Sequence, residues 1–221
     1  MDAAAQPTPD YPRTTRTTPT RRADRARYDS ATVHAILDAE FVCHLGFVAD
    51  GAPVVLPTLY ARVDRRLYLH GSTGSRPMRT IDGERVCVTV TIPDGIVLAR
   101  AAMHHSVNYR SVVAHGIAHR VTDPAERAVA LDALVDQVAP GRSADCRPAN
   151  AKEHAMTAVL RLDLDEVSAK VRTGAVADEP EDLELPHWAG VIPVRRTLGA
   201  PVPDGALAAG TPLPGYLSHR A

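Results

Sequence analysis

The chain has 221 residues and a mass of 23.7 kDa, with 45% hydrophobic and 23% charged residues. This balance is typical of one globular domain with appendages and excludes a chain that is disordered or fibrous as a whole. A formal net charge of −1 argues against nucleic-acid binding through bulk basicity, and no apolar stretch is long enough to span a bilayer. The three cysteines, Cys43, Cys87 and Cys146, lack metal-ligand spacing and are typical of reduced thiols in a cytoplasmic protein.

Order is expected to begin near residue 25. Before it, Ala, Pro, Thr and Arg follow one another without apolar periodicity, so we interpret residues 1–24 as a disordered N-terminal arm. Asp29 or Ser30 can then cap a helix. Its apolar side chains recur at helical spacing, at Val33, Ile36 and Leu37.

The apolar pattern then changes to short runs rich in Val, Leu and Tyr, which indicate strands. Turn signals such as Asp50-Gly51 and Asp82-Gly83 separate them. The expected strands cover residues 41–48, 54–60, 66–70, 85–92, 96–102 and 111–121. We interpret Asp94-Gly95 as a turn between the fourth and the fifth.

Helix signals return after the last of these runs. Thr122-Asp123-Pro124 predicts a helix start, and helices are expected over residues 125–138 and near 151–157. One or two further strands are expected over residues 159–164 and 167–171. Many short strands with few helices predict a mainly β fold, a small antiparallel barrel with helices outside it.

A polar loop follows the predicted strand that ends at His70. It contains Gly71, Gly74, two serines and a threonine, and it leads to Arg76. Backbone N–H groups and hydroxyls in such a loop can hold a phosphate while the arginine supplies charge. The alternative is a polar hairpin turn. The loop lacks the Gly-Lys-Ser/Thr ending of a P-loop.

Residues 103–111 place many polar and aromatic groups in a connection between strands, where they are costly to bury unless they are paired or face a ligand. His104 and His105 point to opposite faces and make a poor two-ligand metal site, but a single histidine can be an axial heme ligand. Trp188, the only tryptophan, either caps a planar cofactor, lies in a dimer interface or fills a groove of its own subunit.

An ordered set of segments carries a family resemblance. It includes Cys43-His44-Leu45-Gly46-Phe47, residues 55–60, 67–76, 86–91 and 105–113, Val167–Arg172 and Trp188-Ala189-Gly190-Val191. In this order they resemble the pyridoxamine 5′-phosphate oxidase-like flavin-binding split-barrel proteins, in their nitroimidazole-reductase-like branch. The resemblance covers residues 25–195 and leaves residues 196–221 as an extended Gly/Pro-rich tail. It implies an α+β fold, a six-stranded antiparallel split β-barrel with peripheral helices, in a homodimer that holds FMN at its interface.

The resemblance also implies site residues. Those lining the flavin are Pro57, Thr58 and Tyr60, and those taking its phosphate are His70, Ser72, Ser75 and Arg76. The resemblance places two residues along the isoalloxazine ring, Val88 and Thr89. It places three near the edge of the ring, Tyr109, Arg110 and Ser111, and it implies that Trp188 closes the site. Many relatives carry lysine where this chain has Arg76 or Arg79.

The expected function is that of an FMN-dependent oxidoreductase acting on a small organic substrate, with a nicotinamide nucleotide as electron donor. Such an enzyme needs few acid–base residues of its own, because the flavin carries the redox chemistry. One alternative is the same barrel with heme or a deazaflavin, with His70, His104 and His105 as candidate iron ligands. The other is a non-catalytic flavin-binding or regulatory protein. No catalytic residue, metal ion, nucleic acid or membrane partner is assigned.

Overall fold

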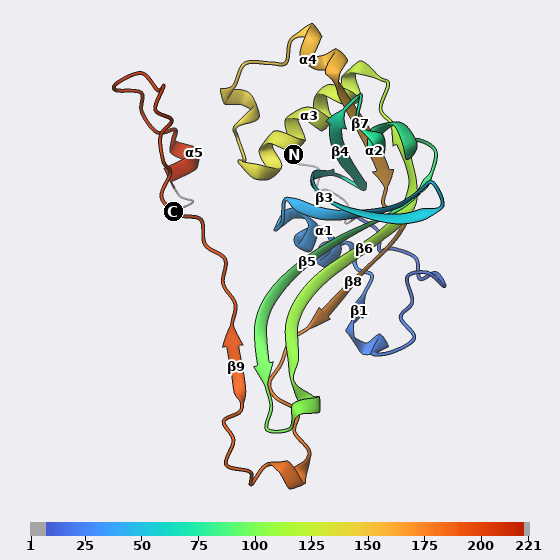
Figure 1. The fold of residues 1–221 in the computed structure, drawn as a ribbon, viewed down its shortest axis with the longest axis vertical. Coiled ribbons are helices and arrows are strands. Elements are labelled where there is room, and N and C mark those ends of the chain that lie inside the picture. The colour runs from blue at the N-terminus through green and yellow to red at the C-terminus, as the bar shows by residue number, and fades with distance from the viewer. Residues whose placement is uncertain (1–7, 219–221) are drawn as a thin grey trace, which may run out of the picture.

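The computed structural model describes residues 8–218, and antiparallel strands dominate it (Figure 1). The strands are β1 (Ala26–Arg27), β2 (Val42–Ala49), β3 (Ala52–Val63), β4 (Arg66–Ser72), β5 (Arg85–Leu98), β6 (Ser106–Arg120), β7 (Thr157–Asp163), β8 (Glu166–Arg172) and β9 (Gly190–Pro193). The helices are α1 (Ser30–Asp38), α2 (Arg76–Thr80), α3 (Pro124–Val138), α4 (Ala151–Met156) and α5 (Gly215–Ser218). The strands and helices predicted between residues 29 and 171 are present, except that the two strands predicted at 85–92 and 96–102 form the single strand β5. The elements β1, α2, β9 and α5 were not predicted.

The strands pair in the order β1-β8-β6-β7-β4-β3-β2-β5-β9, and β6 also pairs with β5. This additional pairing closes a ring of six strands, β2 to β7, which confirms the predicted split barrel. The split arises where two strands change partners. β3 pairs with β2 as far as Leu59 and with β4 from Tyr60 onward. β6 pairs with β5 and β8 over most of its length and pairs with β7 only through residues 118–120.

Alternating side chains fill the barrel with aliphatic groups. On β2, Cys43, Leu45 and Phe47 are buried, whereas His44 and Val48 face outward. Leucines of β4 and β7 meet these residues in the interior, at Leu67, Leu69, Leu160 and Leu162, all of them fully buried. The period of two along each strand therefore separates an apolar core from an outer face that is available to ligands.

Capping residues begin the two longer helices where the sequence predicts. The Asp29 side chain accepts a hydrogen bond from the backbone N–H of Thr32 at 2.8 Å, and that of Asp123 accepts one from Glu126 at 2.7 Å. A second small core lies between α3 and the outer side of β4, formed by Tyr68, Val121, Ala130 and Val159. It holds α3 against the barrel wall.

Residues 8–22 pack along the barrel, which differs from the disorder predicted from their composition. Tyr11 is only 3% exposed, and its Oη lies 2.7 Å from His34 Nε2. The Arg65 guanidinium lies 3.9 Å from the centre of the Tyr11 ring, and Tyr28 Oη donates a hydrogen bond to the Thr17 carbonyl at 2.9 Å. A single buried aromatic side chain therefore anchors a segment whose average composition is polar. Residues 1–7 of the predicted arm lie outside the described residues.

β5 and β6 extend beyond the barrel as a long two-stranded ribbon (Figure 1). The predicted turn at Asp94-Gly95 is instead an irregularity within β5, where the register shifts between Pro93 and Gly95. Arg110 bridges it with two hydrogen bonds to Asp94, of 2.9 and 2.8 Å. β9 pairs with the end of β5, and the chain then runs extended to α5. No helix within residues 8–218 is both long and apolar enough to cross a membrane.

Candidate functional site

A cavity of about 710 Å³ is lined by residues of β3, β4, α3, α4 and the loop after α3. His70 reaches it from β4, one position after the inward-facing Leu69. Most of its wall is apolar and comes from Leu59, Leu131, Leu134, Val135 and Val138. Its volume lies within the range of small-molecule and cofactor pockets.

His70 is the unusual group of this cavity. Its Nδ1 is buried and has no hydrogen-bond partner among the described residues. Burial lowers the pKa of the His70 imidazole below its ordinary value of 6.5, which keeps the ring neutral at physiological pH. The neutral imidazole is the form that binds a metal ion. Because Nδ1 is closed off from the cavity, a ligand there would meet the other ring nitrogen of His70, Nε2.

Two arginines line the polar side of the same cavity. Arg147 donates two hydrogen bonds to Glu153, of 3.0 and 2.7 Å, and this contact lowers the pKa of Glu153 to about 2. Arg142 donates a hydrogen bond to Tyr216 Oη at 3.1 Å. An apolar chamber with guanidinium groups on one side suits a flat apolar ligand that carries carboxylates.

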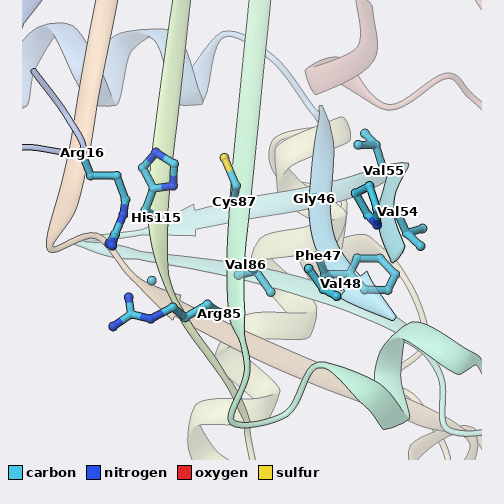
Figure 2. Close-up of a pocket in the computed structure, with 12 residues that line it drawn as sticks. Arg16, Gly46, Phe47, Val48, Val54, Val55, Arg85, Val86, Cys87 and His115 are labelled. Atoms are coloured by element: carbon cyan, nitrogen blue, oxygen red, sulfur yellow. The ribbon is translucent and has the colours of Figure 1, made fainter. Parts of the chain in front are cut away.

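A second hollow, of about 370 Å³, lies on the outer face of the barrel (Figure 2). Arg16, Arg85 and His115 gather on one side of it, and apolar side chains lie on the other, those of Phe47, Val48, Val54 and Val55. The wall between them contains Gly46, Cys87 and Gly116. Gly46 and Cys87 leave room for a ligand to approach the strands closely, whereas the absence of a side chain at Gly116 makes room for Leu162 of the core.

Some predicted flavin-binding residues meet on this outer face. His44 of β2 pairs with Pro57 on one side and Thr89 on the other, so all three lie in one row across β3, β2 and β5. Ser111 pairs with Lys170, and both line a smaller adjoining hollow. Thr58 lies beside Pro57 and is half-buried.

Other predicted residues lie elsewhere, and two of them require a correction. Tyr60 and Val88 are 0% and 1% exposed and belong to the barrel core, so their side chains do not line a ligand on the outer face. Tyr60 Oη donates a hydrogen bond to the Leu37 carbonyl at 2.5 Å. Arg110 pairs with Asp94 on the ribbon, where Tyr109 lies next to it. Trp188 is 67% exposed just before β9.

The predicted phosphate loop uses its own backbone N–H groups. Thr73 N–H donates to the Met156 carbonyl at 2.9 Å, and Ser75 N–H donates to the Ser72 carbonyl at 2.9 Å. Gly74 N–H donates to Ser72 Oγ at 3.2 Å. Arg76, whose side chain is 58% exposed, pairs with Asp50. The charge of Arg76, rather than the loop amides, is therefore what this segment offers an anion.

Of the three histidines considered as iron ligands, His70 alone lines the cavity beside α3. His104 and His105 lie at the far end of the ribbon, where His104 Nε2 is 3.9 Å from Glu179. Within residues 8–218, no group of three or more His, Cys, Asp or Glu side chains is placed to hold a metal ion.

Sequence reasoning did not find the cavity, because its lining comes from segments far apart in the chain. One signal was available. Leu134, Val135 and Val138 follow Leu131 at helical spacing along α3, and the small core against β4 does not include these three. The cationic side of the outer hollow was also missed, because Arg16 belongs to a segment expected to be disordered.

The closed six-stranded barrel with a hollowed outer face defines a split-barrel protein of the flavin-binding class. A family model described as pyridoxamine 5′-phosphate oxidase matches residues 29–171. The chain therefore belongs to the pyridoxamine 5′-phosphate oxidase family, as its sequence resemblance implied. A comparison with curated proteins finds no match.

Solved structures extend the likeness over nearly the whole chain. The flavocytochrome Anf3 from Azotobacter vinelandii is 40% identical with a TM-score of 0.89, over 96% of this chain and 99% of that one. An FAD and heme binding protein from Mycobacterium smegmatis is 37% identical with a TM-score of 0.84, over 89% of this chain and 97% of that one. A candidate 5-nitroimidazole antibiotic resistance protein from Bacteroides thetaiotaomicron shares the fold, at 20% identity and a TM-score of 0.51, over 66% of this chain and 86% of that one.

Proposed function

We propose that this chain is a redox protein that binds a flavin on the outer face of the barrel and heme in the cavity beside α3. The observation that carries the proposal is the position of the His70 imidazole in the wall of an apolar cavity of about 710 Å³. It is supported by the likeness to a flavocytochrome and to an FAD and heme binding protein, at 40% and 37% identity.

The residues present fit heme. His70 would offer a neutral imidazole to the iron, and the leucines and valines of α3 and β3 would pack on the macrocycle. Arg142 and Arg147, which pair with Asp145 and Glu153 in this structure, would exchange these partners for the heme carboxylates. Bound heme supplies one-electron redox chemistry at its iron. The apolar wall excludes water from this region, and the burial that lowers the His70 pKa keeps protons from competing for the ring.

The flavin is assigned to the row of Pro57, His44 and Thr89, with Arg76 as the cation for its phosphate. The chain's part is to orient the flavin and to shield one of its faces, because the flavin itself carries hydride and electron chemistry. The electron donor is expected to be a nicotinamide nucleotide, and the substrate a small organic molecule.

The two proposed sites adjoin through β3. Pro57 lies on the outer face, and Leu59, two positions along the same strand, lies in the cavity wall. Two residues of a strand span about 7 Å. The chain would therefore hold the two groups on neighbouring parts of one strand.

The proposal includes a homodimer. Val48 and Val55 are 61% and 64% exposed on the outer face of β2 and β3, which is unusual for aliphatic side chains of a barrel. A second copy would bury them and would enclose the flavin between the two subunits. The three free cysteines remain the basis for expecting a cytoplasmic location.

The test is the visible spectrum of the protein purified from cells supplied with riboflavin and a heme precursor. A flavin spectrum together with a Soret band supports the proposal, and a protein that binds neither FMN, FAD nor hemin overturns it. Bound flavin that no nicotinamide nucleotide reduces and no acceptor reoxidises would favour the non-catalytic alternative.

A further inference from the structure

The outer face of the barrel continues along the ribbon as one side of a single sheet. On β5, Cys87 follows the buried Val86, so alternation turns Cys87 outward, beside its partner His115 on β6 (Figure 2). Val107, which pairs with Ile96, lies eight positions from His115 on β6 and therefore faces the same way. Ile96 thus shares the outer face with Cys87, and the ribbon extends this face beyond the barrel.

An exposed row of aliphatic side chains crosses the ribbon on this face. Ile96 pairs with Val107 on one side and with Ile192 on the other, and the three are 43%, 44% and 47% exposed. We call them the ribbon row. Two more exposed aliphatic side chains, Val48 and Val55, lie on the barrel part of the same face. Such a concentration of exposed aliphatic groups on one sheet face indicates a docking surface.

The two aliphatic groups lie at equal distances from the middle of the face. Successive pairings across β2 and β5 connect Val55 with His115, so the row that contains Val55 crosses β6 at His115. The ribbon row crosses β6 at Val107. Both positions are four residues, or about 13 Å, from Ser111. Ser111 therefore marks the centre of a face on which aliphatic groups recur on either side.

The barrel end of this face is basic. Arg85, at the start of β5, faces outward, and Arg16 and His115 lie near it (Figure 2). Within residues 8–218 the Arg85 side chain forms no hydrogen bond or ion pair, and no aspartate or glutamate lines the hollow beside it. The positive charge of Arg85 is therefore not neutralised within its own subunit.

The free end of the ribbon is acidic. Just past the end of β5, the N–H and the guanidinium of Arg100 donate hydrogen bonds to the Asp178 carboxylate, at 3.0 and 2.8 Å. Three further acidic side chains follow before β9 begins, Glu181, Asp182 and Glu184, which we call the acidic segment. None of these three forms an ion pair in the described part of the chain. The fold thus holds a negative group without a partner at the end of the ribbon.

The order of groups along the face is therefore basic, aliphatic, polar, aliphatic and acidic. A half-turn about an axis through Ser111 exchanges the two aliphatic groups and brings the basic end to the place of the acidic one. A dimer with two-fold symmetry uses the same surface on both subunits and requires this kind of self-complementarity. Opposite charges at matching positions also fix the relative orientation of the two subunits.

We propose that two copies of this chain pack these faces against each other in antiparallel orientation, so that the ribbon of each subunit lies along the barrel of its partner. Val48 and Val55 of one subunit pack on the ribbon row of the other, and Arg85 of one subunit faces the acidic segment of the other. This inference rests on the homodimer of the proposed function and assigns the surfaces that meet in it.

The test reverses the charge at each end of the face and measures the dissociation constant of the dimer by analytical ultracentrifugation. Arg85→Glu places like charges opposite each other, and so does the double substitution Glu181→Arg with Glu184→Arg. Each variant alone should raise the dissociation constant by at least about tenfold, because the contact occurs twice in a symmetric dimer. An equimolar mixture of the two variants should recover dimers, since each mixed contact again joins opposite charges.

Lys152→Glu is the matched control, because this exposed lysine of α4 lies outside the face and its substitution changes the charge by the same amount as Arg85→Glu. The parent offers a measurement that needs no substitution. Its dissociation constant should rise with salt concentration, because salt screens the charges at the two ends.

Charge-reversed variants as dimeric as the parent would overturn this arrangement and leave the homodimer standing. The arrangement is also wrong if both variants are monomers with the circular dichroism of the parent and their mixture forms no dimer. A parent dissociation constant that salt does not raise contradicts the pairing of the charged ends. A parent that is monomeric at micromolar concentration overturns the arrangement and the homodimer together.

Discussion

Arg76 donates a hydrogen bond to Asp50 and thereby joins the start of α2 to the turn between β2 and β3. Both side chains are largely exposed, at 58% and 84%. An exposed pair of this kind contributes at most about 1 kcal/mol. In the proposed flavin site, a phosphate dianion would therefore compete with the Asp50 carboxylate for Arg76 and could displace it.

Arg76→Ala should weaken FMN binding by about 10- to 150-fold, because it removes a charge-assisted hydrogen bond to the phosphate. Arg76→Lys should lose less, since the charge remains. Asp50→Asn should tighten FMN binding by removing the competitor, and asparagine tolerates the positive φ of 52° at this turn position. Fluorescence titration measures all three. Riboflavin, which lacks the phosphate, should bind equally to each variant.

Arg62→Ala is the control for these variants, because Arg62 pairs with Asp38 on another part of the surface, at 2.6 Å. If Arg76→Ala binds FMN as tightly as the parent, the phosphate assignment is wrong.

His70→Ala should weaken hemin binding by more than about tenfold, because even the partners of metal ligands contribute 10- to 100-fold to affinity. The measurement is the Soret band during titration of the heme-free protein. His105→Ala is the control, because that side chain is exposed at the end of the ribbon. A Soret band that is unchanged in position and midpoint in His70→Ala would exclude this residue as the iron ligand.

The stability of the heme-free protein should fall as the pH decreases from about 7.5 to about 5.5. Burial lowers the pKa of His70 in the folded state. At a pH between the pKa values of the folded and the unfolded state, His70 is therefore protonated more often in the unfolded chain. A falling pH then stabilises the unfolded state relative to the folded one. The pKa values of His34 and His115 are lowered too and act in the same direction.

Urea unfolding at the two pH values measures the difference, and His70→Leu should show a smaller one. The carboxylates whose pKa values are lowered affect the pH dependence of stability only below this pH range. If the stability of His70→Leu changed with pH as much as that of the parent, the pKa of His70 would be the same in the folded and the unfolded state.

Tyr60→Phe should cost about 1 kcal/mol of unfolding free energy and leave flavin binding unchanged. The substitution removes the hydrogen bond from Tyr60 to the Leu37 carbonyl, which still accepts one from Gln137 at 3.0 Å. Chemical denaturation and flavin titration measure the two effects. If Tyr60→Phe weakened flavin binding without changing the unfolding free energy, Tyr60 would belong to the flavin site after all.

Light scattering at micromolar concentration should give twice the chain mass of 23.7 kDa. Val55→Glu places a charge on the exposed aliphatic surface of β3 and should shift the protein toward monomer. A parent mass equal to that of one chain would contradict the dimer.

The parts of the fold that could be predicted are those set by local pattern. Asp29 and Asp123 mark helix starts because a side-chain acceptor satisfies a free N–H there, whatever the rest of the fold does. β9 could not be predicted, since its four residues form a strand only where the end of β5 offers a free edge. The packing of residues 8–22 depends in the same way on distant contacts, such as those from Tyr11 to His34 and from Arg16 to Glu166.

The site was only partly predictable for a similar reason. Of the residues that the family resemblance predicted to contact the flavin, Pro57 and Thr89 lie on the outer face, whereas alternation along the strands turns Tyr60 and Val88 into the core. His70 was predicted as a phosphate ligand or an iron ligand, and only tertiary structure shows that it faces the cavity beside α3.

The pairing of β4 with β7 also determines when the cavity beside α3 can form. Arg66 pairs with Asp163, so the barrel closes over a long intervening segment, and such non-local closure is slow. During synthesis, β2 and β3 can pair early, whereas α3, α4 and β7 emerge from the ribosome last among the cavity's walls. The cavity around His70 is therefore complete only after the later half of the chain has folded. Heme is expected to enter a nearly complete protein rather than to guide its folding.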